Sequence, residues 1–334
     1  MKPYLIHAVV MLCLLTILGR AEAKDLIFTQ GYNCVEVIDV DSDQIVANIP
    51  VPGFVREVVW TEDNKTMYLT TQRHKIVKID LHQLKVVKVY DANWDGWKRN
   101  IWGFVLSNDG KTGYINSIDR KVEGGEVLVR ETISQIDLED GKVLRSMTPP
   151  WGVSSLVYMK DERSLYAVGL DLYKIDLTQN EMKVVETRPM LEKKMDILPI
   201  WPSTHENGGI FLTNYYTPEY MGLLSINGNT GEIVDRKING PPVMAYCFIY
   251  SPDKKKAYGI MDNIEVIDLE TNTVVKSFPN AEGTSFSIIP SSDGKKLYAG
   301  AGGSTITVYD AKSYQVLKVL QMQSDAVALN RVSF

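Results

Sequence analysis

The sequence is poor in the residues that most often bind metals or carry out covalent catalysis. It contains 4 histidines and 3 cysteines among 334 residues. No pair of these residues has the spacing of a zinc site, and there is no Cys-x-x-Cys-His motif for covalent haem. A Gly-x-Ser-x-Gly nucleophile motif and a glycine-rich phosphate loop are also missing. We therefore predict no catalytic, cofactor-binding or metal-binding residue on this chain.

Long hydrophobic runs are also scarce, and the clearest lies at the N-terminus. Lys2 precedes an apolar run from Tyr4 to Leu18, and small residues follow at Ala21 and Ala23, a pattern typical of a secretory signal peptide. The run is shorter than the roughly 20 residues that span a bilayer. We predict that residues 1–23 are a cleaved signal peptide and that the mature protein is periplasmic, without a membrane anchor.

Basic residues are outnumbered by acidic ones, 36 Lys and Arg against 41 Asp and Glu, for a net charge of -5. An acidic protein is not attracted to nucleic acid or to anionic lipid. We therefore expect neither nucleic acid nor membrane among its partners. After export Cys34 and Cys247 would remain, and an oxidising compartment permits a disulfide between them. They fall in different copies of the repeat described next, which favours free thiols, but the sequence leaves their pairing open.

What the chain does contain is a repeat. An alternating apolar strand ends in Asp or Asn at a turn, and another apolar pair follows, as in Val35–Val46 and Ile264–Val275. The turn position is occupied at Asp39, Asp80, Asp137, Asp176, Asn227, Asp268 and Asp310. Most successive copies are about 40 residues apart, which suits a four-stranded propeller blade. Within each copy, apolar and polar residues alternate with a period of two, as in a half-buried strand. The repeated carboxylates are interpreted as caps of turn amides.

A second motif, a turn followed by a basic residue and an aromatic residue, precedes most copies. Its aromatic position is occupied at Phe28, Tyr68, Tyr114, Tyr166, Phe211, Tyr258 and Tyr298. The first copy has almost no chain before it, whereas residues 326–334 alternate after the last copy is complete. We predict an all-β, seven-bladed β-propeller that forms one domain, 24–334. The C-terminal strand would pair into blade one and close the ring, which removes unpaired edges.

Two longer steps indicate insertions, one around Asp119–Val129 and one around Asn214–Met221. Aromatic residues concentrate near these places, and Trp with Arg is typical of protein interfaces. The candidates for a partner or pocket face are Trp94, Trp97, Trp102, Trp201, Tyr215 and Tyr216. Packing between blades would explain these side chains equally well. The charged blade-three segment is either a partner-docking element or a solvated hairpin.

Four segments are similar to the β subunit of quinohaemoprotein amine dehydrogenase, a YVTN-like propeller. They are Leu165–Val185, Ile197–Pro202, Tyr246–Leu269 and Asp293–Leu320. The resemblance implies a periplasmic complex that oxidises primary amines to aldehyde and ammonia. Cysteine tryptophylquinone would lie on a small subunit and haem c on a dihaem cytochrome c subunit, while this chain supports both. Electrons would pass onward to a small copper protein or a cytochrome c.

Other functions remain in competition with this resemblance. The heavy chains of methylamine and aromatic amine dehydrogenases contain more disulfide-bonded cysteines than this chain can provide. A propeller lactonase would need a polar metal constellation in the central channel, for which His205 is a single candidate. A secreted propeller that only binds a partner is the main alternative.

Overall fold

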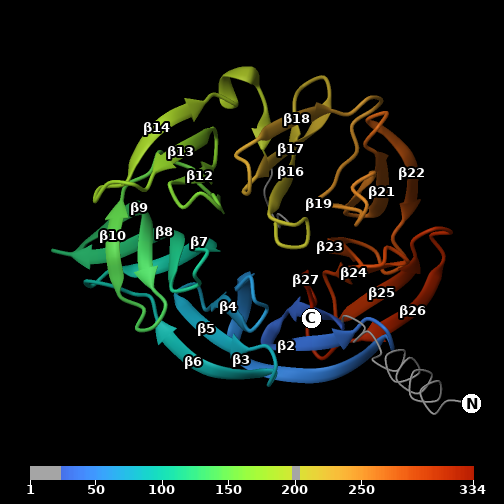
Figure 1. The fold of residues 1–334 in the computed structure, drawn as a ribbon, viewed down its shortest axis with the longest axis horizontal. Helices are drawn as coiled ribbons and strands as arrows, with labels where there is room; N and C mark the ends of the chain where they lie inside the picture. Colours follow the sequence, from blue (N-terminus) through green and yellow to red (C-terminus); the bar gives the residue numbers. More distant parts are fainter. Residues whose placement is uncertain (1–23, 198–203) are drawn as a thin grey trace, which may run out of the picture.

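The computed structural model describes residues 24–197 and 204–334, which form 27 strands and one short 3-10 helix, η1 (Leu191–Lys193). Figure 1 shows the sheets arranged in chain order around a central axis. The C-terminal strand β27 pairs with β1, the first strand of the described chain. This is the architecture of a β-propeller, so the predicted all-β propeller class is confirmed. The predicted signal peptide 1–23 and the candidate Trp201 lie outside the described residues.

The first sheet has seven strands in the order β27-β1-β2-β3-β4-β5-β6. Their bounds are β1 (Asp25–Gln30), β2 (Tyr32–Asp39), β3 (Gln44–Trp60), β4 (Thr66–Thr71), β5 (Lys75–Asp80), β6 (Lys85–Asp91) and β27 (Ala328–Ser333). The long strand β3 changes partner, pairing with β2 up to Phe54 and with β4 from Val55 onward. β27 pairs with β1 along six residues, as predicted for the C-terminal strand.

The other five sheets have four antiparallel strands each. The first two contain β7 (Lys98–Leu106), β8 (Thr112–Glu123), β9 (Glu126–Asp137) and β10 (Val143–Met147), then β11 (Ser155–Tyr158), β12 (Ser164–Val168), β13 (Leu172–Asp176) and β14 (Lys183–Arg188). The third contains β15 (Asp196–Ile197), β16 (Ile210–Tyr216), β17 (Met221–Asn227) and β18 (Ile233–Lys237). The last two contain β19 (Cys247–Tyr250), β20 (Lys256–Ile260), β21 (Asn263–Asp268) and β22 (Thr273–Pro279), then β23 (Ser285–Pro290), β24 (Lys296–Ala301), β25 (Thr305–Asp310) and β26 (Val316–Gln321).

The two repeated motifs have the structural roles expected from their chemistry. The repeated Asp or Asn accepts hydrogen bonds from turn amides in all seven copies. The seven aromatic positions are all buried. They pack between neighbouring sheets: Tyr68 of β4, for example, meets Phe104 of β7 edge to face at 6.4 Å. The repeat therefore supplies both the turns and the inter-sheet core.

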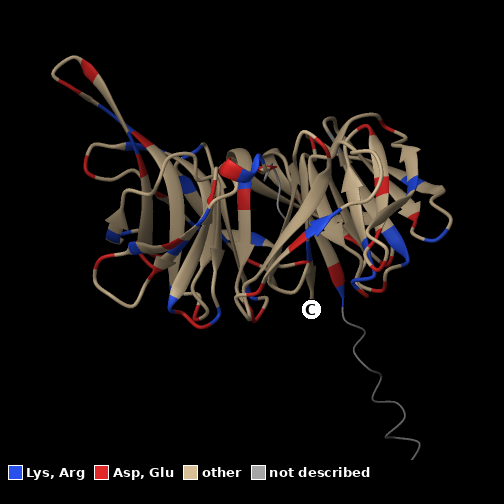
Figure 2. Ribbon diagram, turned by 90° about the horizontal axis from the view of Figure 1, so that it is seen from above, with Lys and Arg blue, Asp and Glu red and all other residues tan. Residues whose placement is uncertain are grey.

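The insertion expected around Asp119–Val129 is present as an arm. β8 and β9 are 12 residues long, and their hairpin stands out from the ring with acidic residues near its tip (Figure 2). The tip turns through Gly124 and Gly125, both with positive φ. Beyond Arg120 the two strands pair only with each other.

The insertion expected around Asn214–Met221 is elsewhere. β16 and β17 pair residue for residue from Ile210 and Asn227 to Tyr216 and Met221, with a short turn between them. The additional chain lies before β16 and includes η1, β15 and a turn at Thr204–Gly209. The number of residues between successive repeated turn positions shows that a repeat contains extra chain. It does not show which connection between strands contains that chain.

Candidate functional site

The described tryptophans of the candidate face lie on or beside β7. Trp94 and Trp97 face each other across an isolated antiparallel bridge, and Trp94 is 42% exposed. The Arg130 guanidinium of β9 covers the Trp97 ring at 3.9 Å. The Arg56 guanidinium covers Trp102 at the same distance, from the neighbouring strand β3. Trp97 and Trp102 are thus each held by a cation–π contact, and Trp94 keeps the most open surface.

The arm adds apolar surface next to this tryptophan turn. Val122, Val127 and Val129 are 68%, 51% and 55% exposed, although they lie on paired strands. A Cβ at Gly96, in the Trp94–Trp97 turn, would lie 3.5 Å from the Lys121 side chain, so the turn sits against the arm. We call the tryptophan turn and the exposed valines together the arm surface.

The base of the arm is fixed by a buried ionic network. Asp119 of β8 is fully buried and accepts hydrogen bonds from Ser117 at 2.6 Å and Thr132 at 3.0 Å. Arg130 and the buried Arg99 lie 3.5 and 3.9 Å from its carboxylate. Burial lowers the pKa of Arg99 while Asp119 opposes that shift. Because a two-stranded ribbon is marginal by itself, this network explains how the arm keeps its direction.

Tyr215 and Tyr216, predicted as candidates for a partner or pocket face, lie on β16, apart from the arm surface. Tyr215 is fully buried, and its hydroxyl donates to Asp235 at 2.5 Å. The Tyr216 hydroxyl donates to the Val243 carbonyl and accepts from the Ala245 amide, both at 3.1 Å. Period-two alternation places these neighbours on opposite faces of β16, where each packs against a different part of the core.

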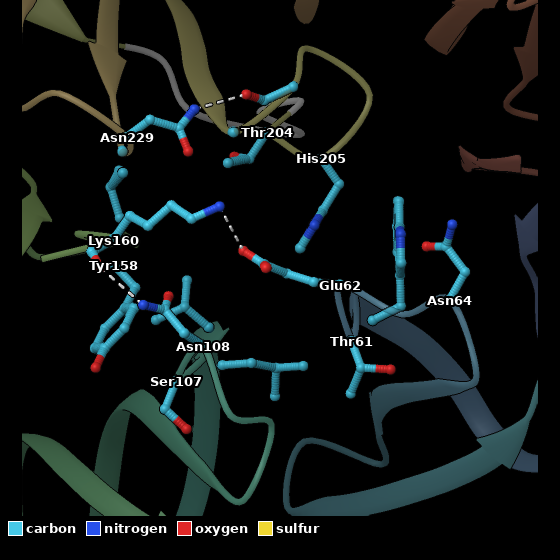
Figure 3. Close-up of a pocket in the computed structure, with 17 residues that line it drawn as sticks. Thr61, Glu62, Asn64, Ser107, Asn108, Tyr158, Lys160, Thr204, His205 and Asn229 are labelled. Carbon is cyan, nitrogen blue, oxygen red and sulfur yellow. Dashed lines mark hydrogen bonds and ion pairs between the residues drawn. The ribbon is translucent and has the colours of Figure 1, made fainter. Parts of the chain in front are cut away.

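A cavity of about 430 Å³ opens at the centre of the ring (Figure 3). Turns that follow β3, β7 and β11 line it, together with the Thr204–Gly209 turn. That turn reaches several sheets at once. His205 stacks on Trp60 with ring centroids 4.3 Å apart, the Asn207 amide oxygen accepts from the Tyr250 amide at 3.0 Å, and Glu206 accepts from the Arg331 backbone amide. The turn therefore acts as a plug in the central channel.

Two charged side chains are part of the lining of this cavity. Lys160 and Glu62 form an ion pair at 3.2 Å across it, and Asn108 donates to the Lys160 carbonyl at 2.8 Å (Figure 3). The His205 ring keeps exposed surface toward the cavity while the channel walls surround it. Desolvation lowers the pKa of His205 against the opposing effect of Glu62, so the ring is neutral at pH 7.

A smaller cavity of about 70 Å³ adjoins the first and shares Trp60 and His205 with it. Two carboxyl groups, of Glu57 on β3 and Glu206 on the plug, line this inner cavity. Desolvation raises the pKa of Glu57 to about 8, although the charge of Arg56 acts to lower it. Arg56 Nε lies 3.9 Å from the Glu57 carboxyl oxygen. Desolvation also raises the pKa of Glu206 to about 7, although hydrogen bonds from the Glu206 and Arg331 backbone amides and the charge of Arg331 act to lower it. Perturbed carboxyls in a cavity mark a candidate site.

Sequence reasoning missed this inner cavity. His205 was considered only as a lactonase ligand, and Glu57 and Glu206 carry no motif. The one available signal was Glu57, a glutamate among the apolar residues near the end of β3. Within residues 24–197 and 204–334, no group of three or more His, Cys, Asp and Glu side chains is placed to hold a metal ion. Cys34 and Cys247 are separate buried thiols.

Replacing Glu206 by Gln should alter the pH dependence of stability. A carboxyl whose pKa is raised on folding favours the folded state while protonated, and this contribution is lost as pH rises from the unfolded pKa near 4.5 through about 7. We expect Glu206→Gln to be progressively stabilised relative to wild type between pH 4 and pH 8, measured by urea unfolding. A constant difference across this range would contradict the burial of an ionisable Glu206.

The fold recurs in solved structures of low sequence identity. Hydrazine synthase from Kuenenia stuttgartiensis is 16% identical, with 88% of this chain and 90% of that chain covered and a TM-score of 0.57. Dihydro-heme d1 dehydrogenase NirN is 15% identical over 93% and 76%, with a TM-score of 0.57. The β-propeller domain of Cps50 (Swd1) from Myceliophteria thermophila is 14% identical over 81% and 87%, with a TM-score of 0.54. What they share with this chain is the propeller.

At these identities the similarity concerns the fold alone. No protein-family model matches the sequence, and no curated protein matches it. Among the residues that the structure describes, no helix has the length and hydrophobicity needed to cross a bilayer.

Proposed function

We propose that this chain is the non-cofactor propeller subunit of a periplasmic quinohaemoprotein amine dehydrogenase, which oxidatively deaminates primary amines to aldehyde and ammonia. The chain is exported with loss of residues 1–23. It supports a small subunit that carries cysteine tryptophylquinone and a dihaem cytochrome c subunit. A small copper protein or cytochrome c accepts the electrons. The resemblance of four segments to the family's β subunit supports this assignment, and the arm surface is the structural observation that carries it.

The ring in this proposal has seven blades. The seven-stranded sheet counts as two blades that share β3, because β3 pairs with β2 in its first part and with β4 in its second. With the five four-stranded sheets, this makes seven blades in one domain, 24–334. The pairing of β27 with β1 closes the ring between the last sheet and the first.

The arm surface has the composition of a protein-binding surface. Tryptophan and arginine are over-represented among the residues that dominate binding energy, and here Arg130 already holds Trp97 in place. Three valines stand in solvent on a ribbon whose base is fixed by Asp119. A partner that covers these side chains would gain about 25 cal/mol of binding free energy for each Å² of apolar surface removed from water. A preorganised arm loses little conformational entropy on binding, which favours a stable complex.

The names of two compared structures, hydrazine synthase and dihydro-heme d1 dehydrogenase, denote enzymes. They support the idea that this fold can serve redox chemistry. The alternative is a secreted propeller that binds a partner through the same arm surface without any enzymatic complex. Both functions use the arm, and they differ in whether haem and a quinone accompany the chain.

Affinity purification from the periplasm after growth on a primary amine distinguishes the two functions. Mass spectrometry, a haem stain and an amine-dependent dye-reduction assay should detect a dihaem chain, a small quinone-bearing chain and activity. Recovery of a single colourless chain without dye reduction would overturn the dehydrogenase assignment.

Replacing Trp94 and Trp97 together by Ala should reduce recovery of the partner chains by about tenfold or more, because interface tryptophans contribute about 2 kcal/mol or more. Trp151→Ala is the matched control, since Trp151 is 67% exposed and lies outside the arm surface. Thermal melting of all variants checks that the ring is intact. Equal recovery with the double variant and the control would rule out the arm surface as the docking site.

A further inference from the structure

The inner cavity contains polar groups that have no hydrogen-bond partner among the described residues. Glu206 Oε1 is enclosed and accepts no hydrogen bond from the described residues. The Asn330 side chain of β27 is only 9% exposed and lines the same cavity, and its Nδ2 also lacks a partner. An enclosed acceptor and an enclosed donor are costly when unsatisfied. Together they define what a ligand must supply: a hydrogen-bond donor to Glu206 and an oxygen acceptor to Asn330.

The charge and walls of the inner cavity specify the ligand further. Glu57 of β3 adds a second carboxyl group to the lining of the same cavity. An ammonium group has three N–H donors and complements two carboxylates. Phe104, Val105 and Leu156 supply apolar parts of the cavity wall. Such a wall suits a short hydrocarbon chain better than a hydrated inorganic ion.

We propose that the inner cavity binds a small amino alcohol, with its ammonium group at Glu206 and Glu57 and its hydroxyl oxygen accepting from Asn330. In this proposal the ligand enters through the larger cavity, past the Glu62–Lys160 pair that Figure 3 shows and along the stack of Trp60 and His205. This site is separate from the arm surface and goes beyond the proposed function. It lies on this chain alone, so its test does not depend on any partner subunit.

Three isosteric probes separate the features of the ligand. Ethanolamine carries both groups, n-propylamine replaces the hydroxyl by methyl, and 1-propanol replaces the ammonium by methyl. Isothermal titration of the purified full chain in phosphate at pH 8 should give the order ethanolamine, n-propylamine, 1-propanol from tightest to weakest. A ligand of four non-hydrogen atoms reaches a dissociation constant of about 0.05 mM at best, so the titration must extend to roughly 10 mM.

The affinity for ethanolamine should rise about tenfold from pH 6 to pH 8. The cation binds the ionised carboxylate, and Glu206, with a pKa of about 7, is mostly protonated at pH 6. Arg331 faces Glu206 from β27, and Arg56 lies beside Glu57. Among the described residues, Glu57 and neutral His205 are the other titratable groups that line this cavity. His205 stays neutral over this range, so we assign the pH dependence to the two carboxyl groups.

Single substitutions assign each contact. Glu206→Gln should weaken ethanolamine binding by about tenfold or more and flatten its pH dependence. Asn330→Ala should remove the advantage of ethanolamine over n-propylamine while both amines still bind. Glu219→Gln, an exposed change on the short turn after β16, is the control and should change neither. Urea unfolding confirms that each variant is folded.

Three results would overturn the proposal. One is the absence of ethanolamine binding up to 10 mM in folded protein at pH 8. A second is equal binding of 1-propanol, which would make the cavity merely apolar. The third is binding of Ca²⁺ that Glu206→Gln abolishes while ethanolamine has no effect, which would assign the carboxyl groups to an inorganic ion.

Discussion

Truncation of the chain after Asp325 should abolish stable folding. β27 provides six residues that pair with β1 and buries Leu329 and Val332 in the core. Leu329 also donates its backbone amide to Ser287 of the neighbouring sheet at 3.1 Å, so the strand joins two sheets. Each buried Leu or Val contributes about 1.5–3 kcal/mol, and the exposed edge of β1 would lose its hydrogen bonds as well. These losses approach the 5–15 kcal/mol that keeps a typical domain folded.

The truncated protein should be recovered mostly insoluble, or should unfold at a urea concentration far below that of wild type. A matched control shortens the arm instead, by removing Val122, Glu123, Glu126 and Val127. Gly124–Gly125 would then join Lys121 to Leu128, which are already paired. This variant should unfold as wild type does. Equal stability of the truncated chain and the control would contradict the stabilising role assigned here to the pairing of β27 with β1.

Replacing Asp119 by Ala should destabilise the protein by about 3–5 kcal/mol, because Arg99 would keep a buried charge without its partner. Ser117 and Thr132 would also lose the acceptors of their hydroxyl groups. Removing one member of a buried pair costs more than the pair itself contributes, since the desolvated charge remains. Urea unfolding monitored by tryptophan fluorescence measures the loss.

A double replacement tests this interpretation of Asp119. Arg99→Met with Asp119→Leu removes both charges and fills the volume, so it should recover most of the stability. Glu126→Ala, an exposed change on the same arm, should shift the free energy of unfolding by less than about 0.5 kcal/mol. A double variant that is less stable than Asp119→Ala would show that the hydroxyl contacts matter more than the buried charge.

Local sequence patterns predicted the parts of this protein whose causes are local. Asp268 lies at a repeated turn position, and its carboxylate accepts from the Glu270 and Thr271 amides within the same turn. Tyr258 and the other repeated aromatic residues are buried because period-two alternation points them into the core. The long arm was visible as extra length between repeats, and the pairing of residues 328–333 with β1 followed from the missing strand of the first repeat.

The features that sequence reasoning missed depend on contacts between distant segments. The sequence left Tyr215 open to a partner-facing or a packing role, because its environment is set by Asp235 and a neighbouring sheet. His205 and Trp60 are far apart in the sequence and stack only because the ring brings the plug to β3. No spacing rule links such positions, since each element's place around the axis depends on the packing of every sheet before it.

By itself, the sequence determined the all-β class, the repeat, the turn caps and the strand that pairs the two ends of the chain, because these follow from alternation and from hydrogen bonds within a few residues. The tertiary structure alone decided which aromatic residues stay exposed and which carboxyl groups share the central channel. Exposure and pKa are set by the atoms that surround a side chain, and in a ring those atoms come from sheets that are remote in sequence.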